Sequence, residues 1–93
     1  MKNKKLKFVR SKLDKLDLKI LGLIKKRTSL VNQVIKIKKF KNQIVDNKRI
    51  IEVLKKIRLN SIKKKIDPKI TQKIWKSMIS SYIEYEKNKF KKK

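Results

Sequence analysis

The sequence predicts an all-α protein of three helices, and two of its features support this prediction. The 93-residue chain has one glycine and one proline, so it lacks the residues that turns between strands usually require. Its apolar residues recur at intervals of three and four, which is the spacing of one helix face. We therefore expect a single domain over residues 1–93, nearly all helical, with its core between about residues 6 and 90.

The first predicted helix is the longest, with about thirty residues from Val9 onwards. At about 1.5 Å per residue it would be roughly 45 Å long, whereas a compact globule of this chain length has a diameter of about 30 Å. The rest of the chain is too short to cover it, so we expect a second copy to do so in an intertwined homodimer. The apolar positions of this helix are Val9, Leu13, Leu16, Ile20, Leu23, Ile24, Leu30, Val31, Val34 and Ile37.

Two shorter helices are predicted after a polar loop at residues 39–45. One runs from about residue 46 to 65, with Asp46 as its N-cap. The other runs from Pro68 to about residue 90, because Asp67 followed by Pro68 has the form of an N-cap with proline in the first helical position. The residues expected to face inward are Ile50, Ile51, Leu54 and Ile57 in the first of these helices, and Ile74, Trp75, Ile79, Ile83 and Phe90 in the second.

The composition narrows the possible chemistry. The chain has no cysteine and no histidine, which excludes a disulfide, a thiol nucleophile, an imidazole base and an ordinary zinc site. Its seven acidic residues are scattered singly, so we expect no metal and no cofactor. The sequence shows no signal peptide and no membrane span. We therefore expect a cytoplasmic protein with no membrane partner.

The basic residues permit two interpretations. A net charge of +24 and a pI of about 10.6 are typical of nucleic-acid-binding proteins. The lysines, however, are spread along the whole chain, which is also rich in isoleucine and asparagine, as a biased genome composition would produce. We interpret most of the charge as solvated surface. A basic helical module that binds nucleic acid, or another helical interaction module, remains the alternative from a different class.

Only four of the 31 basic residues are arginine, and a guanidinium can grip a carboxylate through two parallel hydrogen bonds. Arg27 lies within the apolar stripe of the first helix, and Lys38, eleven residues later, falls within about 20° of the same face. Arg10 is seventeen residues before Arg27 and roughly 100° away around the helix, so it suits the cavity of a partner subunit better than its own. The alternative for Arg27 is a side chain whose charged end reaches solvent.

Charged residues on the other two helices are also unusual. Glu86 lies on the apolar side of the third helix, where burial favours a protonated carboxyl group that can donate a hydrogen bond. The alternative is an ion pair with one of the lysines. Arg49 lies in the first turn of the second helix, where a positive charge opposes the helix dipole. We therefore expect Arg49 to be kept for a reason other than helix stability.

The ordered set of these residues resembles the all-helical chorismate mutases. The resemblance covers about residues 6–90 and implies an intertwined three-helix dimer that rearranges chorismate to prephenate in aromatic amino acid biosynthesis. This pericyclic reaction needs neither a cofactor nor a covalent intermediate. The residues that carry the resemblance are Arg10, Leu13-Asp14-Lys15-Leu16-Asp17, Arg27, Lys38 and Asp46-Asn47-Lys48-Arg49.

The resemblance also implies a role for each of eight site residues. Two arginines would hold the carboxylates of chorismate, two residues would donate hydrogen bonds to its ether oxygen, two would border its ring hydroxyl, and two would form apolar walls. In that order, these residues are Arg27 with Arg10 of the partner subunit, Lys38 with Glu86, Asp46 with Arg49, and Val34 with Ile83.

Three departures from the family pattern bear on this assignment. Position 50 is isoleucine here, whereas many mutases have a glutamate there that contacts the ring hydroxyl. The loop before Arg49 is one residue shorter, which makes Lys39 a possible substitute for Lys38. Ile50 and the pair Tyr82-Ile83 also resemble the isochorismate pyruvate lyases of the same fold. We favour the mutase because those lyases usually have glutamine where Glu86 stands.

Overall fold

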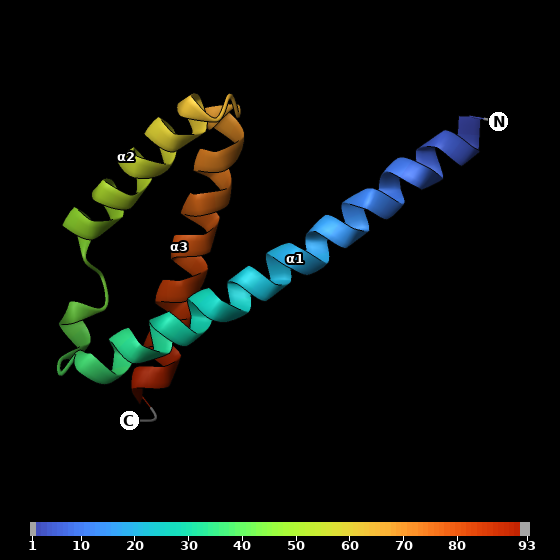
Figure 1. Ribbon diagram of the computed structural model, residues 1–93. Helices are drawn as coiled ribbons and strands as arrows, with labels where there is room; N and C mark the ends of the chain where they lie inside the picture. Colours follow the sequence, from blue (N-terminus) through green and yellow to red (C-terminus); the bar gives the residue numbers. More distant parts are fainter. Residues whose placement is uncertain (1, 92–93) are drawn as a thin grey trace. The chain divides into compact units, whose positions relative to one another are not determined.

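The computed structural model describes residues 2–91, and the outermost residues of the predicted 1–93 domain lie outside that range. Three α-helices and one short 3₁₀ helix make up the described chain: α1 (Lys2–Ile37), η1 (Lys41–Gln43), α2 (Asn47–Lys63) and α3 (Pro68–Lys91) (Figure 1). No strand occurs between residues 2 and 91. The predicted all-α class with a long first helix is therefore confirmed.

The helix bounds differ from the predicted ones mainly at the start of α1. This helix begins at Lys2 rather than at Val9 and contains 36 residues. Residues 2–7 are mostly lysine and leucine, which favour helix even where the apolar repeat has not yet begun. α2 ends at Lys63, two residues earlier than predicted, and η1 lies inside the predicted loop.

The chain divides into two compact units, one ending at Gln33 and the other beginning at Val34. Within the described residues, the first unit consists of α1 alone. Its apolar residues repeat at the 3-4 spacing of a coiled-coil seam, yet they are between 46 and 63% exposed. A single helix cannot bury its own stripe, so this face needs another element to cover it. The exposed stripe comprises Leu6, Val9, Leu13, Leu16, Ile20 and Leu23.

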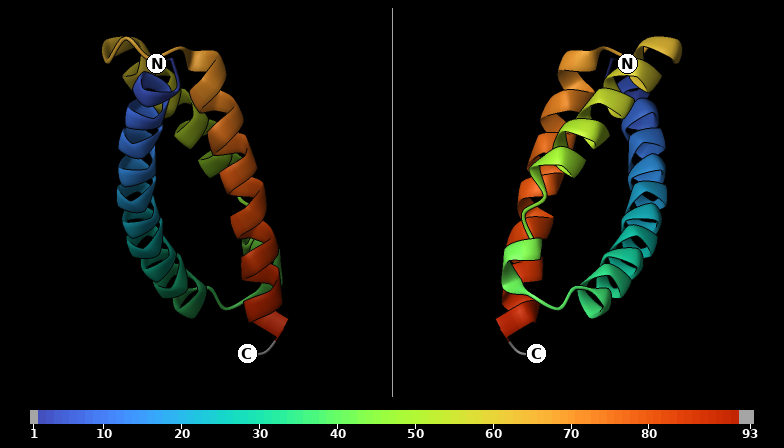
Figure 2. Two further views of the ribbon diagram at one scale, coloured as in Figure 1. Left: turned by 90° about the vertical axis from the view of Figure 1, so that its right-hand side faces the viewer. Right: turned by 90° about the vertical axis from the view of Figure 1, so that its left-hand side faces the viewer.

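The second unit contains the last turn of α1, η1, and a hairpin in which α2 and α3 lie side by side (Figure 2). The predicted inward residues Ile50, Leu54 and Ile57 are half-buried. The prediction was wrong for Ile51 and Ile74, which are 66% and 49% exposed. The inner face of α2 runs through positions 50, 54, 57 and 61, and Ile51 lies about 100° away from Ile50 around the helix.

Capping interactions set the turn between α2 and α3. The Lys65 N–H donates to Ile62 O at 3.1 Å and the Ile66 N–H to Ser61 O at 2.8 Å, which is the Schellman pattern of a helix C-terminus. Lys65 therefore occupies the left-handed position, with φ of 59°. The Lys69 N–H then donates to Asp67 Oδ1 at 2.9 Å, which confirms the predicted N-cap ahead of Pro68.

Polar side chains connect the two helices of the hairpin near this turn. The buried Ser61 hydroxyl donates to Ile57 O at 2.6 Å, and its oxygen lies 2.7 Å from Thr71 Oγ1. The Thr71 hydroxyl also lies 3.4 Å from the carbonyl oxygen of Pro68, to which it can donate. Gln72 Nε2 also donates to the carbonyl of Leu54 at 2.9 Å. These bonds fix the register of α3 against α2.

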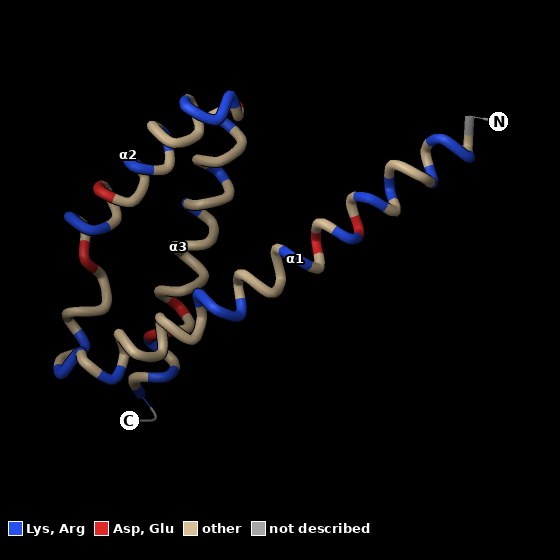
Figure 3. Tube along the Cα trace, in the orientation of Figure 1, with Lys and Arg blue, Asp and Glu red and all other residues tan. Residues whose placement is uncertain are grey.

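The charge of the chain is not confined to one helix. Lysine and arginine occur along α1, α2 and α3 (Figure 3). This distribution agrees with the interpretation of most basic residues as solvated surface. Within residues 2–91, no helix is long and apolar enough to cross a membrane.

Candidate active site

Two of the predicted site residues meet in the second unit. Lys38 directly follows α1, and Glu86 lies in the last two turns of α3. Lys38 Nζ is 3.6 Å from Glu86 Oε2, and the two side chains are 21% and 11% exposed. Lys38 Nζ also donates to the carbonyl oxygen of Ile44 at 3.4 Å, a long hydrogen bond. The fold thus brings together a cation and a carboxyl group separated by 48 positions in the sequence.

The environment of this pair distinguishes it from the other charges of the chain. Glu86 is buried, with 9% of the residue exposed, and a buried carboxylate requires a nearby cation or donor to offset its lost hydration. Lys38 supplies that cation, whereas Lys39 is exposed. The structure therefore places Lys38, and not Lys39, beside Glu86. The ion pair predicted as the alternative role for Glu86 is thus present.

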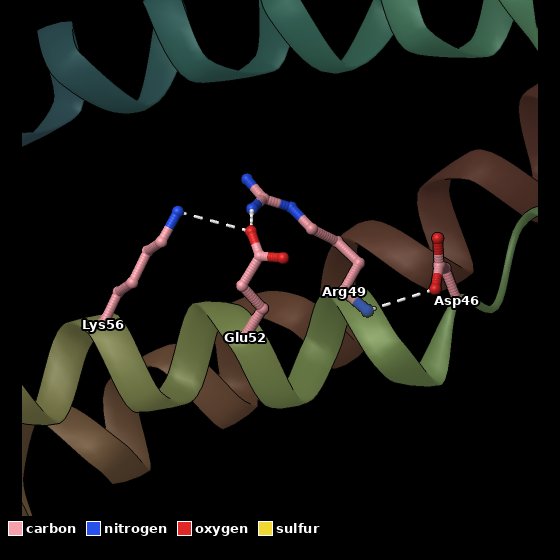
Figure 4. A network of polar contacts seen from close by, with 4 residues as sticks. All are labelled: Asp46, Arg49, Glu52 and Lys56. Atoms are coloured by element: carbon pink, nitrogen blue, oxygen red, sulfur yellow. Dashed lines mark hydrogen bonds and ion pairs between the residues drawn. The ribbon is translucent and has the colours of Figure 1, made fainter.

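Asp46 and Arg49 form a second group at the start of α2 (Figure 4). Asp46 Oδ1 accepts a hydrogen bond from the Arg49 backbone N–H at 3.1 Å, which confirms the predicted N-cap. The Arg49 side chain is 60% exposed, and its Nη1 lies 2.6 Å from Glu52 Oε1. Lys56 Nζ is 3.3 Å from the same oxygen. Hydrogen bonds from Lys56 and then Arg49 lower the pKa of Glu52.

Glu52 was not predicted from the sequence, although its spacing gives a signal. It is three residues after Arg49 and four before Lys56, so all three side chains share one side of α2. Position 50 is about 200° away from position 52 around the helix. Glu52 therefore does not replace the glutamate that many mutases have at position 50. It holds the Arg49 guanidinium instead.

The two predicted apolar walls each lie one helical turn from a member of the Lys38 and Glu86 pair. The Lys38 N–H donates to Val34 O at 3.0 Å, so Val34 precedes the lysine by one turn. Val34 is 41% exposed. Ile83 is half-buried on α3, three residues before Glu86. Residues three or four apart lie on the same side of a helix, so Ile83 and Glu86 share one side of α3.

The two predicted carboxylate clamps belong to the first unit. Arg10 and Arg27 are both on α1. Seventeen residues separate them, which corresponds to about 25 Å along the helix axis and about 100° around it. A ligand with one ring cannot contact both arginines of the same helix. If both bind one substrate, Arg10 must come from another copy of the chain.

The structure defines a small all-helical protein in which Lys38 and Glu86 form a shielded polar pair. The family model for chorismate mutase type II matches residues 9–87. The chain belongs to this family, which confirms the resemblance noted in the sequence, and it is an isomerase that converts chorismate to prephenate. Neither a search of curated proteins nor a search of solved structures returned a significant match.

Proposed function

We propose that Lys38 and Glu86 are the catalytic residues of this chorismate mutase. The observation that carries the proposal is their separation of 3.6 Å, with both side chains largely shielded from water. In the rearrangement, the C–O bond to the ether oxygen breaks while a C–C bond forms, and negative charge develops on that oxygen. Two hydrogen-bond donors held close together by the fold can stabilise such charge.

Glu86 can donate a hydrogen bond only when its carboxyl group carries a proton. We therefore propose that the carboxyl group of Glu86 carries a proton when the substrate is bound and donates it in a hydrogen bond to the ether oxygen. The substrate remains the only reacting molecule, and no covalent bond to the protein forms.

Arg27 and Arg10 of the partner subunit complete the site by binding the two carboxylates. Two features of α1 support this: the exposed apolar stripe of the first unit, and the separation of about 25 Å between the two arginines of one helix. Asp46 and Arg49 border the ring hydroxyl, and Val34 and Ile83 line the walls. Held at these points, chorismate is restricted to the folded conformer that reacts.

A mixing experiment tests the contribution of Arg10 across subunits. Arg10→Ala and Lys38→Ala variants are each expected to be inactive as homodimers. After unfolding and refolding together, half of the dimers combine one chain of each kind, and one of their two sites regains every residue. About a quarter of the wild-type turnover should return if Arg10 acts across subunits. No recovery from folded, mixed dimers would contradict this arrangement.

We further propose that both units act together as one domain, because the family match runs from residue 9 to 87 across the division at residue 33. The formation of prephenate supports a role in aromatic amino acid biosynthesis, for which the cytoplasm is the proposed location. A purified homodimer that binds labelled chorismate at one site per chain would support the single domain. Binding that survives removal of residues 1–33 would contradict it.

A lyase activity toward isochorismate is the second candidate, and Ile50 favours it. This residue is half-buried in the first turn of α2, so no carboxylate is available there for the ring hydroxyl. Chorismate and isochorismate should be supplied separately and the products identified. Prephenate from chorismate alone supports the mutase. Pyruvate and salicylate from isochorismate would show that the lyase reaction occurs at the same site.

A further inference from the structure

Two backbone groups that follow α1 converge on the side chain of Gln43. The N–H groups of Lys39 and Phe40 donate to Gln43 Oε1 at 2.8 and 2.9 Å. An amide oxygen has two lone pairs and can accept both bonds. Because α1 ends at Ile37, these are the first N–H groups after Lys38. One exposed side chain therefore closes the loop that begins beside the proposed catalytic lysine.

The end of this loop contacts the side chain of Lys38. The Gln43 N–H donates to Phe40 O at 3.0 Å and the Ile44 N–H to Lys41 O at 3.2 Å, which form the turn η1. The next side chain, Ile44, is 4% exposed and anchors the loop in the second unit. Its carbonyl oxygen accepts the hydrogen bond from Lys38 Nζ at 3.4 Å. The segment from residue 39 to 44 thus ends on the ammonium group that contacts Glu86.

We infer that Gln43 is a positioning residue for Lys38, acting through the loop and the carbonyl group of Ile44. The inference rests on the catalytic role proposed for Lys38. A lysine head sits on a flexible four-carbon stem, so groups around it must fix its position. Gln43 is exposed, and its side-chain oxygen binds backbone N–H groups of the loop, whereas Lys38 Nζ binds the carbonyl oxygen of Ile44. Its effect on the reaction is therefore indirect.

The exposure of these groups allows the positioning role to be separated from stability. Without the Gln43 side chain, the N–H groups of Lys39 and Phe40 can bond to water, so the fold should lose little stability. The loop would gain conformational freedom. The carbonyl group of Ile44 would then no longer hold the ammonium group of Lys38 in one position. Small displacements of a catalytic group reduce the rate much more than they reduce substrate binding.

Turnover of chorismate by three variants tests the inference. Gln43→Ala should lower kcat roughly 10- to 100-fold with little change in KM. Gln43→Glu keeps an acceptor oxygen at the same place and should restore most of the rate. Asn42→Ala, the control, removes a neighbouring exposed amide in the same turn and should behave as wild type. Wild-type kcat in Gln43→Ala, or no rescue by Gln43→Glu, would overturn the inference.

Amide hydrogen exchange provides a readout that does not depend on activity. The N–H groups of Lys39 and Phe40 should be protected in the wild type and in Gln43→Glu, and should exchange at least about tenfold faster in Gln43→Ala. Equal exchange in all three proteins would overturn the proposed loop closure. A folded wild type with protected amides but no turnover would instead refute the catalytic assignment, and the positioning role with it.

Discussion

The two units of the chain differ in how they are stabilised. The hairpin of α2 and α3 has an apolar inner face and polar bonds between its helices, including the contact of Ser61 with Thr71 at 2.7 Å. The first unit is a single helix whose apolar stripe is about half exposed. Apolar stripes of this length are stable only when another surface covers them. The hairpin can thus form from one chain, whereas the first unit depends on contacts outside itself.

The same difference applies to the proposed site. Lys38 and Glu86 are already within 3.6 Å of each other in the second unit. Arg10 and Arg27, which we propose as carboxylate clamps, lie in the unit that needs an additional surface. We therefore expect association of two chains to complete both the apolar packing and the substrate site.

The largest effect is expected from a charge in the exposed stripe. Leu13→Glu should prevent dimer formation, because a carboxylate would have to be buried against apolar side chains. Turnover should fall by about 1,000-fold or more as the partner's arginine is lost. Sedimentation analysis and a prephenate assay would measure both. Lys15→Glu, on the polar side of the same helix, is the control, and an active Leu13→Glu monomer would contradict the proposed dimer.

Replacement of Lys38, the lysine that contacts Glu86, should have the next largest effect. Lys38→Ala should lower kcat by about 100- to 1,000-fold, since it removes a donor to the developing charge. Lys39→Ala should retain most of the rate, because that side chain is exposed, whereas Lys38 is the lysine that contacts Glu86. Steady-state kinetics with chorismate would compare the two. A greater loss in Lys39→Ala would reassign the catalytic lysine.

The proposed donor role of Glu86 predicts a pH dependence of moderate size. A carboxyl group donates a hydrogen bond only in its protonated form, so turnover that depends on donation by Glu86 should fall as the pH is raised. Glu86→Gln donates from an amide at every pH and should remove this decline. Rate profiles between pH 5 and about pH 9 would compare the two proteins. Identical profiles would contradict the donor role.

A smaller effect is expected on the stability of the hairpin. Ser61→Ala removes the hydroxyl that lies 2.7 Å from the buried Thr71 Oγ1 and should lower the free energy of unfolding by about 1–2 kcal/mol. Urea denaturation would measure the change, with Ser80→Ala on the exposed side of α3 as the control. Equal stability of the two variants would show that the buried contact contributes no more than an exposed hydroxyl.

The smallest expected change is a gain in stability at the end of α2. Lys65 has φ of 59°, a conformation that costs a residue with a side chain about 1 kcal/mol relative to glycine. Lys65→Gly should raise the free energy of unfolding by about that amount, as measured in urea. Lys64→Gly, whose φ is −88°, should not be stabilising. A loss of stability in Lys65→Gly would show that the lysine side chain outweighs the backbone strain.

Local signals in the sequence predicted the elements and several individual residues. The apolar spacing predicted three helices, and Asp46 and Asp67 were correctly predicted as N-caps. Ile51 was placed on the wrong side because a pair of adjacent isoleucines does not show which of the two faces inward. Glu52 was not predicted to contact Arg49, and Gln43 was not predicted to bind the loop backbone. Their partners are lysine, arginine and backbone N–H groups, which are too common in this chain to give a signal.

By itself, the sequence determined the helical class, the starts of α2 and α3, and the order of charged residues that marks a chorismate mutase. These properties depend on periodicity, capping and short spacings, which act over a few neighbouring residues. Only the tertiary structure decided that Lys38 rather than Lys39 contacts Glu86. It also decided that the Lys38 ammonium group donates to the carbonyl oxygen of Ile44. Such contacts depend on how α3 packs and how the loop turns, so no local pattern of residues encodes them.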